Sequence, residues 1–475
     1  MSSIKLSDFT KLPVILVYIA LITFLPSVDF MPNYIYFHDS QRLFELLLLA
    51  VVLLHFILLR SNTIKLMPLN KNLQYGFYLL LIFSLVSVFL AKSPRHATIE
   101  VSIFAGLSYL TLFIVSLFNE NKALLIKSLI YVLWLSVVLY LLSFYVGYFS
   151  ALISNTPLHW PSPFNGFNNI RLFNQYQLWP IALITLPLLA FNFKKSAQLW
   201  LYFALTCWWI LLFYSASRGV LVAWVVGVAV TAIVYKKLSW PFLRVQLINI
   251  VTGFAGYYFL FKYIPSLRGS TVITSTIARE STSDRIALWA ECLKFIQQNP
   301  IFGIGPMNAP WHNSKMLQPH NSLLQIASEW GLPATFIILA IAAYGIYLWL
   351  KKFNIYTLNS QSNLDKNLAI ILFFTITTNA AYSLVDGVIV MPISQVLMFT
   401  MIGLMIGHYK YGNLVTSNES VITSVFTFRR ILGLVAVVAL IWSTLPEIIQ
   451  GLGGYERGFS MGPNTINPRI WLQIR

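Results

Sequence analysis

Long apolar stretches alternate with short polar linkers along most of this 475-residue chain. An apolar helix of about 17–25 residues is long enough to cross a lipid bilayer. Hydropathy indicates about 13 such stretches. They lie near residues 12–28, 43–59, 73–91, 101–118, 124–149, 176–193, 199–214, 219–235, 244–261, 331–350, 367–385, 393–409 and 430–446. The pattern predicts an all-α polytopic integral membrane protein with about 12–13 transmembrane helices.

One long polar segment, residues 262–330, interrupts this pattern and is rich in Arg, His, Asn, Ser and Pro. A loop of this length is usually functional or disordered. We expect it to be a large extramembrane loop with a functional role and short helices. The chain then divides into transmembrane helices over 1–261, the loop over 262–330, transmembrane helices over 331–446 and a C-terminal tail over 447–475.

The composition supports a membrane protein, because 57% of the residues are hydrophobic and only 10% are charged. The net charge of +17 does not indicate nucleic-acid binding, since the basic residues are scattered between apolar stretches. Cys207 and Cys292 lie in different segments without metal-type spacing, and we expect no disulfide between them.

Basic residues recur on alternate linkers, and more than half of the 32 Lys and Arg fall on one side of the predicted membrane. They include Lys11, Lys122, Lys194-Lys195, Lys236-Lys237, Lys351-Lys352 and Lys410. Cytoplasmic loops hold an excess of Lys and Arg, so we expect this side and the N-terminus in the cytoplasm. With an odd number of spans, the 262–330 loop and the C-terminal tail lie outside, in a bacterial periplasm.

Arg218 follows Ser215-Ala216-Ser217 and precedes Gly219 in a very short turn between two apolar stretches. One interpretation is an interfacial anchor whose guanidinium reaches the lipid headgroups. The small neighbouring residues favour a functional cation, since they let a ligand approach the backbone.

Arg285 begins a segment in which Ile286, Trp289 and Leu293 recur at helical spacing. A cation in the first turn of a helix opposes the helix dipole, which suggests an anion bound at this helix N-terminus. An ordinary surface pair with Asp284 is the alternative.

His320 follows Pro319 and precedes the apolar-periodic Leu323 and Leu324, so we expect it at the mouth of a helix that enters the membrane. A neutral imidazole there can act as a general base. A structural role is the alternative, since the chain contains 7 histidines. The others are His38, His55, His96, His159, His312 and His408.

Motifs of several other enzyme classes do not occur in the sequence, including Walker A and His-Glu-x-x-His. Asp29 and Asp39 lie near each other in the first outer linker, where a metal or a catalytic acid would be conceivable. Solvated loop charges are the simpler interpretation, and we expect no metal site.

A set of motifs in a fixed order resembles the O-antigen ligase superfamily, which comprises O-antigen ligases, O-antigen polymerases and bacterial protein O-oligosaccharyltransferases. The motifs are residues 215–219, Arg285-x-x-x-Trp289, 299–306, 320–325 and 329–332. Together they cover about residues 165–350 and surround the large loop.

The resemblance implies a GT-C-like transferase of the bacterial inner membrane. It would move a glycan from an undecaprenyl-diphosphate carrier to a hydroxyl in the periplasm. Matched motif by motif, Arg218 and Arg285 would hold the diphosphate and His320 would activate the acceptor hydroxyl. The guanidinium fork suits phosphate, and stabilising the departing diphosphate is the main electrostatic task. The transfer would invert the anomeric centre without a metal or other cofactor, since the lipid diphosphate is already activated.

Four further residues are expected to bind substrate: Arg171, Asn321, Glu329 and Asp386. Arg171 belongs to a polar segment, residues 168–175, that is similar to one in the superfamily; an interface anchor is the alternative. Asp386 either lines the cavity or caps a helix end.

The acceptor distinguishes the subgroups of the superfamily. Residues 169–177 and 467–473 look similar to protein O-oligosaccharyltransferases of the type IV pilin kind, so Ser or Thr of such a protein is our first prediction. The alternatives are an O-antigen ligase that acts on lipid A-core and a polymerase that acts on another lipid-linked repeat. A transporter of lipid-linked glycan is a different class. The polar motifs gather on one side of the membrane, which favours an enzyme.

Overall fold

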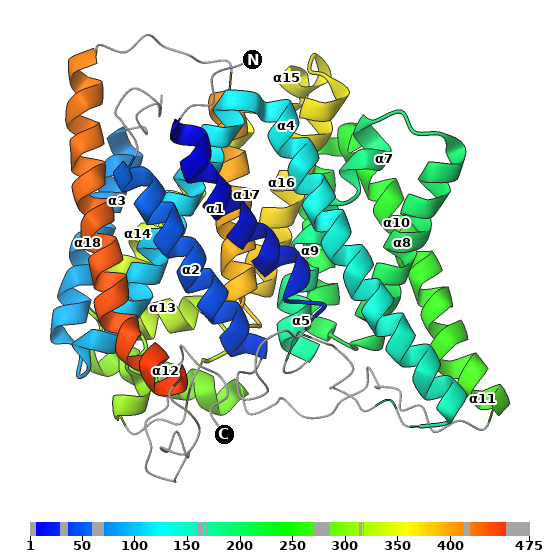
Figure 1. Ribbon diagram of the computed structural model, residues 1–475, viewed down its shortest axis with the longest axis horizontal. Helices are drawn as coiled ribbons and strands as arrows, with labels where there is room; N and C mark the ends of the chain where they lie inside the picture. Colours follow the sequence, from blue (N-terminus) through cyan, green and yellow to red (C-terminus); the bar gives the residue numbers. More distant parts are fainter. Residues whose placement is uncertain are drawn as a thin grey trace.

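The computed structural model describes residues 6–28, 37–58, 71–156, 158, 166–167, 170–268, 285–312, 316, 318–411 and 419–452. Within these residues every regular element is a helix. Most of the long helices run roughly along a common direction and form one bundle (Figure 1). The predicted all-α polytopic membrane class is confirmed.

Seven helical stretches in the described residues are long and apolar enough to cross a membrane. They are α2 (Phe37–Leu58), α3 (Lys71–Leu90), α4 (Pro94–Ser154), α8 (Lys195–Tyr214), Arg218–Leu267, α14 (Leu332–Lys352) and α17 (Pro392–Lys410). Arg218–Leu267 joins α9 (Arg218–Tyr235) to α10 (Trp240–Tyr258) and includes three short helical segments. Shorter apolar helices are Phe9–Phe24, which includes most of α1 (Leu6–Ile19), and Arg430–Pro446 within α18 (Glu419–Leu452).

The long helix α4 is broken at Asn121, whose φ of −155° and ψ of 84° are not helical. The Asn121 Oδ1 atom accepts a hydrogen bond from the Leu124 backbone N–H at 3.0 Å. This side chain therefore caps the second half of α4. The predicted stretches 101–118 and 124–149 form two helices joined without an intervening loop.

The predicted span near 176–193 is not one continuous helix. It divides into α5 (Ile170–Gln177), α6 (Pro180–Leu183) and α7 (Leu186–Ala190), because Pro180 and Pro187 lack the N–H that a continuous helix needs. Side chains of neighbouring helices donate to the backbone carbonyls left free: Gln246 to Ile181 at 3.4 Å, Trp134 to Ile184 at 3.1 Å and Asn367 to Leu189 at 3.4 Å. Irregular backbone is tolerated at membrane depth when protein surrounds it in this way.

Helix α16 (Asn363–Tyr382) is more polar than the spanning helices above, but residues 367–375 are all buried by its neighbours. It packs against α9 and α17. The link from α16 to α17, residues 383–391, is not helical and lies at the end of the bundle that carries α12 (Arg285–Gln298) and α13 (Ser322–Trp330) (Figure 1).

The opposite end of the bundle carries α15 (Ile355–Asn359) (Figure 1). Basic side chains from the linkers predicted to be cytoplasmic meet there. Their contacts are Lys11 with Glu120 at 2.6 Å, Lys122 with Asp365, and Lys352 with the backbone carbonyl of Tyr409. The cation-rich linkers and the helices of the large polar loop therefore lie at opposite ends.

Candidate functional site

Segments that are distant in the sequence meet at the α12–α13 end. The Ser322 backbone N–H donates to the Ser383 carbonyl at 2.8 Å, which fixes the start of α13 on the α16–α17 link. The Trp289 indole N–H donates to the Pro319 carbonyl at 2.9 Å, which ties α12 to the residue before His320. These two bonds bring residues 285–289, 318–322 and 383–387 into one site.

The turn before α9 joins the same site. A Cβ atom placed on Gly219 would lie 3.2 Å from Val385 Cγ2 and 3.4 Å from Tyr382 Cε2, so glycine here allows close packing against the link. The Ser217 side chain also hydrogen-bonds the Tyr382 phenol. The predicted short turn between two apolar helices is confirmed, and Ala216 within it has a φ of +51°.

Asp386 is the most highly coordinated side chain of this site and is 2% exposed. Its Oδ1 atom lies 3.0 Å from Nδ1 of His320, and it accepts from the Gln175 side chain at 2.9 Å and the Gly387 N–H at 2.8 Å. Its Oδ2 atom accepts from the Tyr382 hydroxyl at 2.7 Å. Four hydrogen bonds thus hold one carboxylate in a fixed orientation.

The environment also sets the charge of Asp386. Burial raises the pKa of its carboxyl, but the hydrogen bond and charge of His320 lower it, as do the bonds from Tyr382 and Gly387. The net result is a pKa below the ordinary value of 3.8. Asp386 is therefore an ionised carboxylate at neutral pH.

His320 is the most exposed of the described histidines that approach a carboxylate. Three described histidines approach a carboxylate: His38 with Asp39, His320 with Asp386 and His408 with Asp365. The His38 and His408 side chains are 0% and 4% exposed, whereas His320 is 19% exposed. Of these three pairs, only the one at His320 is open to a substrate.

The two predicted arginines lie beside this pair. Arg285 is the first residue of α12, and its charge acts on the Tyr382 phenol. Its Nε atom is buried and has no hydrogen-bond partner among the described residues. Arg218 is the first residue of α9, next to the Ser217–Tyr382 contact, and its side chain is exposed. The site therefore offers two guanidinium groups, one exposed and one with an unused buried donor.

The structure corrects the predicted surroundings of His320. This residue precedes α13, which has 9 residues, and the spanning helix α14 begins only after Gly331. The break occurs because Gly331 has a φ of +86°, a conformation that ends α13. His320 thus lies at a short helix packed under the link, and not at the mouth of a spanning helix.

The structure also corrects which face of α12 is buried. The helix is confirmed over Arg285–Gln298, but Ile286 and Leu293 are 65% and 51% exposed. Cys292 and Phe295 are buried in their place, against Ile304 and Met316. The spacing predicted the helix correctly and its buried face incorrectly, because Ile304, Ala309 and Met316 pack on the neighbouring side.

Asn321 and Glu329 make structural contacts. The Asn321 side chain accepts from the Leu324 N–H at 3.0 Å and caps α13. Glu329 is 1% exposed, and its carboxylate accepts from the Met307 N–H at 3.3 Å. Each contact holds backbone near the site, and substrate binding by these two residues stays a prediction.

Arg171 lies in α5, four residues before Gln175, and therefore on the same helical face as the donor to Asp386. Its part in substrate binding also stays a prediction. Gln175 and Tyr382 were not predicted. Gln175 lies in the polar segment already singled out, so its position could have been suspected, whereas nothing in the sequence around Tyr382 marks it.

The prediction that Asp39 is a solvated loop charge is wrong, because Asp39 lies within α2 and is 8% exposed. Asp29 lies outside the described residues. Among the described residues, no group of three or more His, Cys, Asp or Glu side chains could hold a metal ion.

Residues 201–339 match the family model described as O-antigen ligase. Residues 201–339 of this chain thus form an O-antigen ligase region. The matched O-antigen ligase region contains Arg218, Arg285 and His320, whereas Asp386 lies beyond it. No curated protein matches the chain. The predicted resemblance is confirmed, and with it the general class of an O-antigen ligase- or polymerase-type membrane glycosyltransferase.

Proposed function

We propose that this protein transfers a glycan from undecaprenyl diphosphate to an acceptor hydroxyl at the periplasmic face of the bacterial inner membrane. The observation that carries the proposal is the His320–Asp386 pair, which lies beside Arg285. His320 and Arg285 belong to the O-antigen ligase region, and Asp386 follows it in the sequence. A base, an orienting carboxylate and cations suit the displacement of a diphosphate by a hydroxyl.

His320 is the proposed base. The Asp386 carboxylate accepts the Nδ1 proton, so the Nε2 lone pair is free to take a proton. The acceptor oxygen gives its proton to Nε2 and attacks the anomeric carbon, while the bond from that carbon to the diphosphate oxygen breaks. Attack opposite the leaving group inverts the anomeric centre. The products are the glycosylated acceptor, undecaprenyl diphosphate and a protonated imidazole.

Arg218 and Arg285 are proposed to bind the diphosphate. Negative charge grows on the departing oxygen, and a guanidinium can bind two phosphate oxygens at once. The buried, unpaired Nε of Arg285 fits this role, because a phosphate oxygen would satisfy it. Arg171, Asn321 and Glu329 are retained as proposed substrate contacts. No step requires a metal or another cofactor.

The orientation follows from the two ends of the bundle. We assign the end with Lys11, Lys122 and Lys352 to the cytoplasm by the excess of Lys and Arg in cytoplasmic loops. The site at the α12–α13 end then faces the periplasm, with the C-terminal tail outside. The partners are the lipid-linked glycan, the acceptor and the bilayer, and no nucleic acid.

For the acceptor we propose Ser or Thr of a protein such as type IV pilin, supported by the likeness of residues 169–177 to that subgroup. Lipid A-core is the second candidate, supported by the family description of the matched region. Transfer to another lipid-linked repeat would make the protein a polymerase.

One experiment tests both levels of the proposal. The purified protein in nanodiscs is given undecaprenyl-diphosphate-linked glycan and either pilin or lipid A-core, and products are measured by mass spectrometry. A new glycosidic bond in wild type and not in His320→Ala supports a transferase, and the productive acceptor identifies the subgroup. Movement of the lipid-linked glycan across a vesicle membrane without any new bond would instead identify a transporter.

A further inference from the structure

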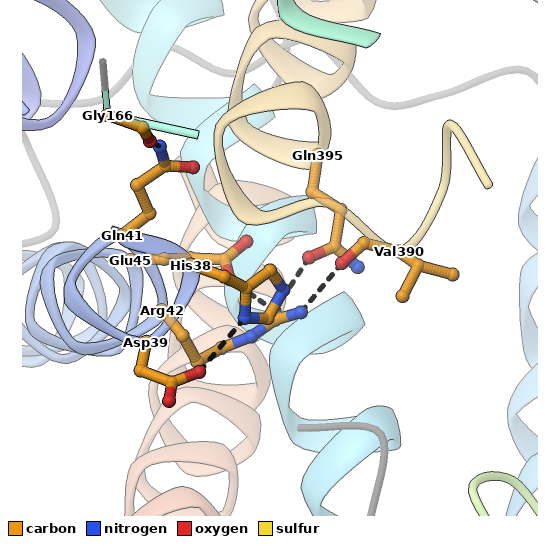
Figure 2. A network of polar contacts seen from close by, with 8 residues as sticks. All are labelled: His38, Asp39, Gln41, Arg42, Glu45, Gly166, Val390 and Gln395. Atoms are coloured by element: carbon orange, nitrogen blue, oxygen red, sulfur yellow. Dashed lines mark hydrogen bonds and ion pairs between the residues drawn. The ribbon is translucent and has the colours of Figure 1, made fainter. Parts of the chain in front are cut away.

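A second polar cluster lies within the bundle, where α2 meets the α16–α17 link (Figure 2). We define the Arg42 cluster as Arg42, Glu45, Gln395 and the Val390 carbonyl. The Arg42 and Glu45 side chains are 2% and 0% exposed. Charged groups so deeply buried are rarely found unless they are paired.

Arg42 makes three contacts through its two terminal nitrogen atoms. Nη1 donates to the Glu45 carboxylate and, at 2.8 Å, to Oε1 of Gln395. Nη2 donates to the Val390 carbonyl at 2.7 Å. Figure 2 shows the guanidinium pointing from α2 toward Gln395 and Val390. One arginine of α2 thus holds both the link and the start of α17.

The carbonyls of Ile389 and Val390, which accept these side-chain bonds, lie in non-helical backbone and so lack the hydrogen bonds of a regular helix. Gln395 donates from Nε2 to the Ile389 carbonyl at 2.8 Å, and Arg42 donates to the next carbonyl in the chain. Pro392 begins α17 directly afterwards. The Arg42 cluster therefore fixes the end of the 383–391 link that lies away from His320.

The other end of the same short link carries Asp386. Tyr382, Gln175 and His320 hold Asp386 as described above. Between the two ends, the Val390 N–H donates to the Gly387 carbonyl at 3.1 Å, so the intervening residues form a tight turn. A displacement at Val390 is transmitted to Gly387, whose N–H donates to the Asp386 carboxylate.

Stability alone does not account for a buried Arg–Glu pair. The free energy needed to remove two charges from water offsets much of their electrostatic attraction in the protein. An apolar pair of similar size is therefore often as stable. Selection of one defined conformation is a use attested for buried polar groups in some proteins. Here the geometry ordered is that of the link with Asp386.

We propose that Arg42 is a positioning residue of this transferase, which acts by holding the 383–391 link so that Asp386 stays aligned with His320. The inference rests on the proposed function. Arg42 bonds to the end of the link that lies away from His320, so its effect on transfer passes through Asp386.

The main test replaces both charges at once, because a single change would leave its partner buried and unpaired. Arg42→Met with Glu45→Leu removes the bonds to Val390 and Gln395 while the helix remains apolar and filled. In nanodiscs, we expect kcat to fall at least tenfold and KM for the lipid-linked glycan to change less than threefold. Unchanged kcat in the folded double variant would overturn the proposal.

Gln395→Leu is the second variant, because it removes the bonds to Ile389 and to Arg42 Nη1 and leaves Arg42 paired with Glu45. If the double variant does not fold, a kcat loss in Gln395→Leu with an unchanged KM supports the role, and a normal kcat contradicts it. His55→Gln is the matched control on the same helix. His55 is buried at the other end of α2, bonded to Thr10 at 3.0 Å, so its replacement should lower thermal stability and leave kcat unchanged.

A double-mutant cycle distinguishes positioning from general stabilisation. In an Asp386→Asn background, the Arg42–Glu45 double change should lower kcat less than twofold further, because its effect passes through a carboxylate already removed. Full additivity of the two losses would contradict the proposal. If wild type itself forms no glycosidic bond, the proposed function fails; if wild type is active and the variants match it, only this inference fails.

Discussion

The Nδ1 atom of His320 lies 3.0 Å from the Asp386 carboxylate, although 66 positions separate the two residues in the chain. We expect His320→Ala to lower transfer by about 10²–10⁴-fold, because it removes the proposed general base. Asp386→Asn should lower kcat by at least about tenfold, because an amide no longer selects the imidazole tautomer with a free Nε2.

Transfer rates of the purified variants in nanodiscs check this, with His312→Gln as a control histidine of the same loop. His312 makes a ring contact with Phe295, so its loss should leave kcat near wild type. Near-normal turnover by His320→Ala would remove His320 as the base.

The arginines supply a second prediction. Arg218→Lys and Arg285→Lys keep the positive charge but lose the guanidinium fork that we propose to bind phosphate. Each should lower kcat/KM for the lipid-linked glycan by on the order of 10²-fold, the effect of removing one charge-stabilising donor. Arg244→Lys, an exposed arginine in the first turns of α10, is the matched control. Equal activity of all three variants would show that phosphate is bound elsewhere.

Tyr382→Phe tests the hydrogen bond to Oδ2 of Asp386, the carboxylate oxygen that His320 does not contact. The change keeps the ring and removes only the hydroxyl that donates to Oδ2 at 2.7 Å. A hydrogen bond to a charged group contributes about 1.5–3 kcal/mol, so kcat should fall by roughly 10- to 100-fold. Steady-state kinetics, together with an unchanged elution volume in size-exclusion chromatography, separate this effect from misfolding. A kcat equal to wild type would show that the other three bonds suffice.

The depressed pKa of Asp386 makes stability depend on pH. Because the folded-state pKa lies below the ordinary 3.8, the ionised carboxylate favours the folded state. This contribution is complete above about pH 4 and is lost as the pH falls through the folded-state pKa. Thermal unfolding should therefore show a steeper loss of Tm in acid for wild type than for Asp386→Asn, and parallel curves would contradict the assignment.

The break between α13 and α14 gives a prediction about folding. Gly331 has a φ of +86°, and an added Cβ would lie 2.1 Å from the Ile301 carbonyl oxygen. Gly331→Ala should lower the free energy of unfolding by at least about 1–3 kcal/mol. Gly345→Ala in α14 is the control, since no atom lies within 4 Å of its added Cβ and alanine favours a helix. Denaturant titration in detergent compares the two, and equal midpoints would contradict the conformational argument.

The helical class could be predicted because apolar length is a local property of the sequence. The order of the motifs likewise located Arg218, Arg285 and His320 within the matched region. The breaks between α5, α6 and α7 could have been suspected from Pro180 and Pro187. The side chains that donate to the free carbonyls could not, because they come from other helices and their positions depend on tertiary packing.

The surroundings of the site were harder to predict, because they depend on contacts between distant segments. Asp386 was a candidate without a partner until the fold placed it against His320. Tyr382 and Arg42 carry no local signal of function, since each acts through the residue that it contacts. The buried face of α12 was predicted wrongly because spacing gives a helix its periodicity, and its neighbours decide which side is covered.

His320 has a φ of +52°, in the left-handed region where glycine and asparagine are the favoured residues. A glycine at this position would relax the backbone and make the folded protein easier to form, yet it would remove the imidazole. Selection of variants for thermal stability alone would thus tend to discard the proposed base. Screens that aim to improve expression of this protein need to keep residue 320 fixed.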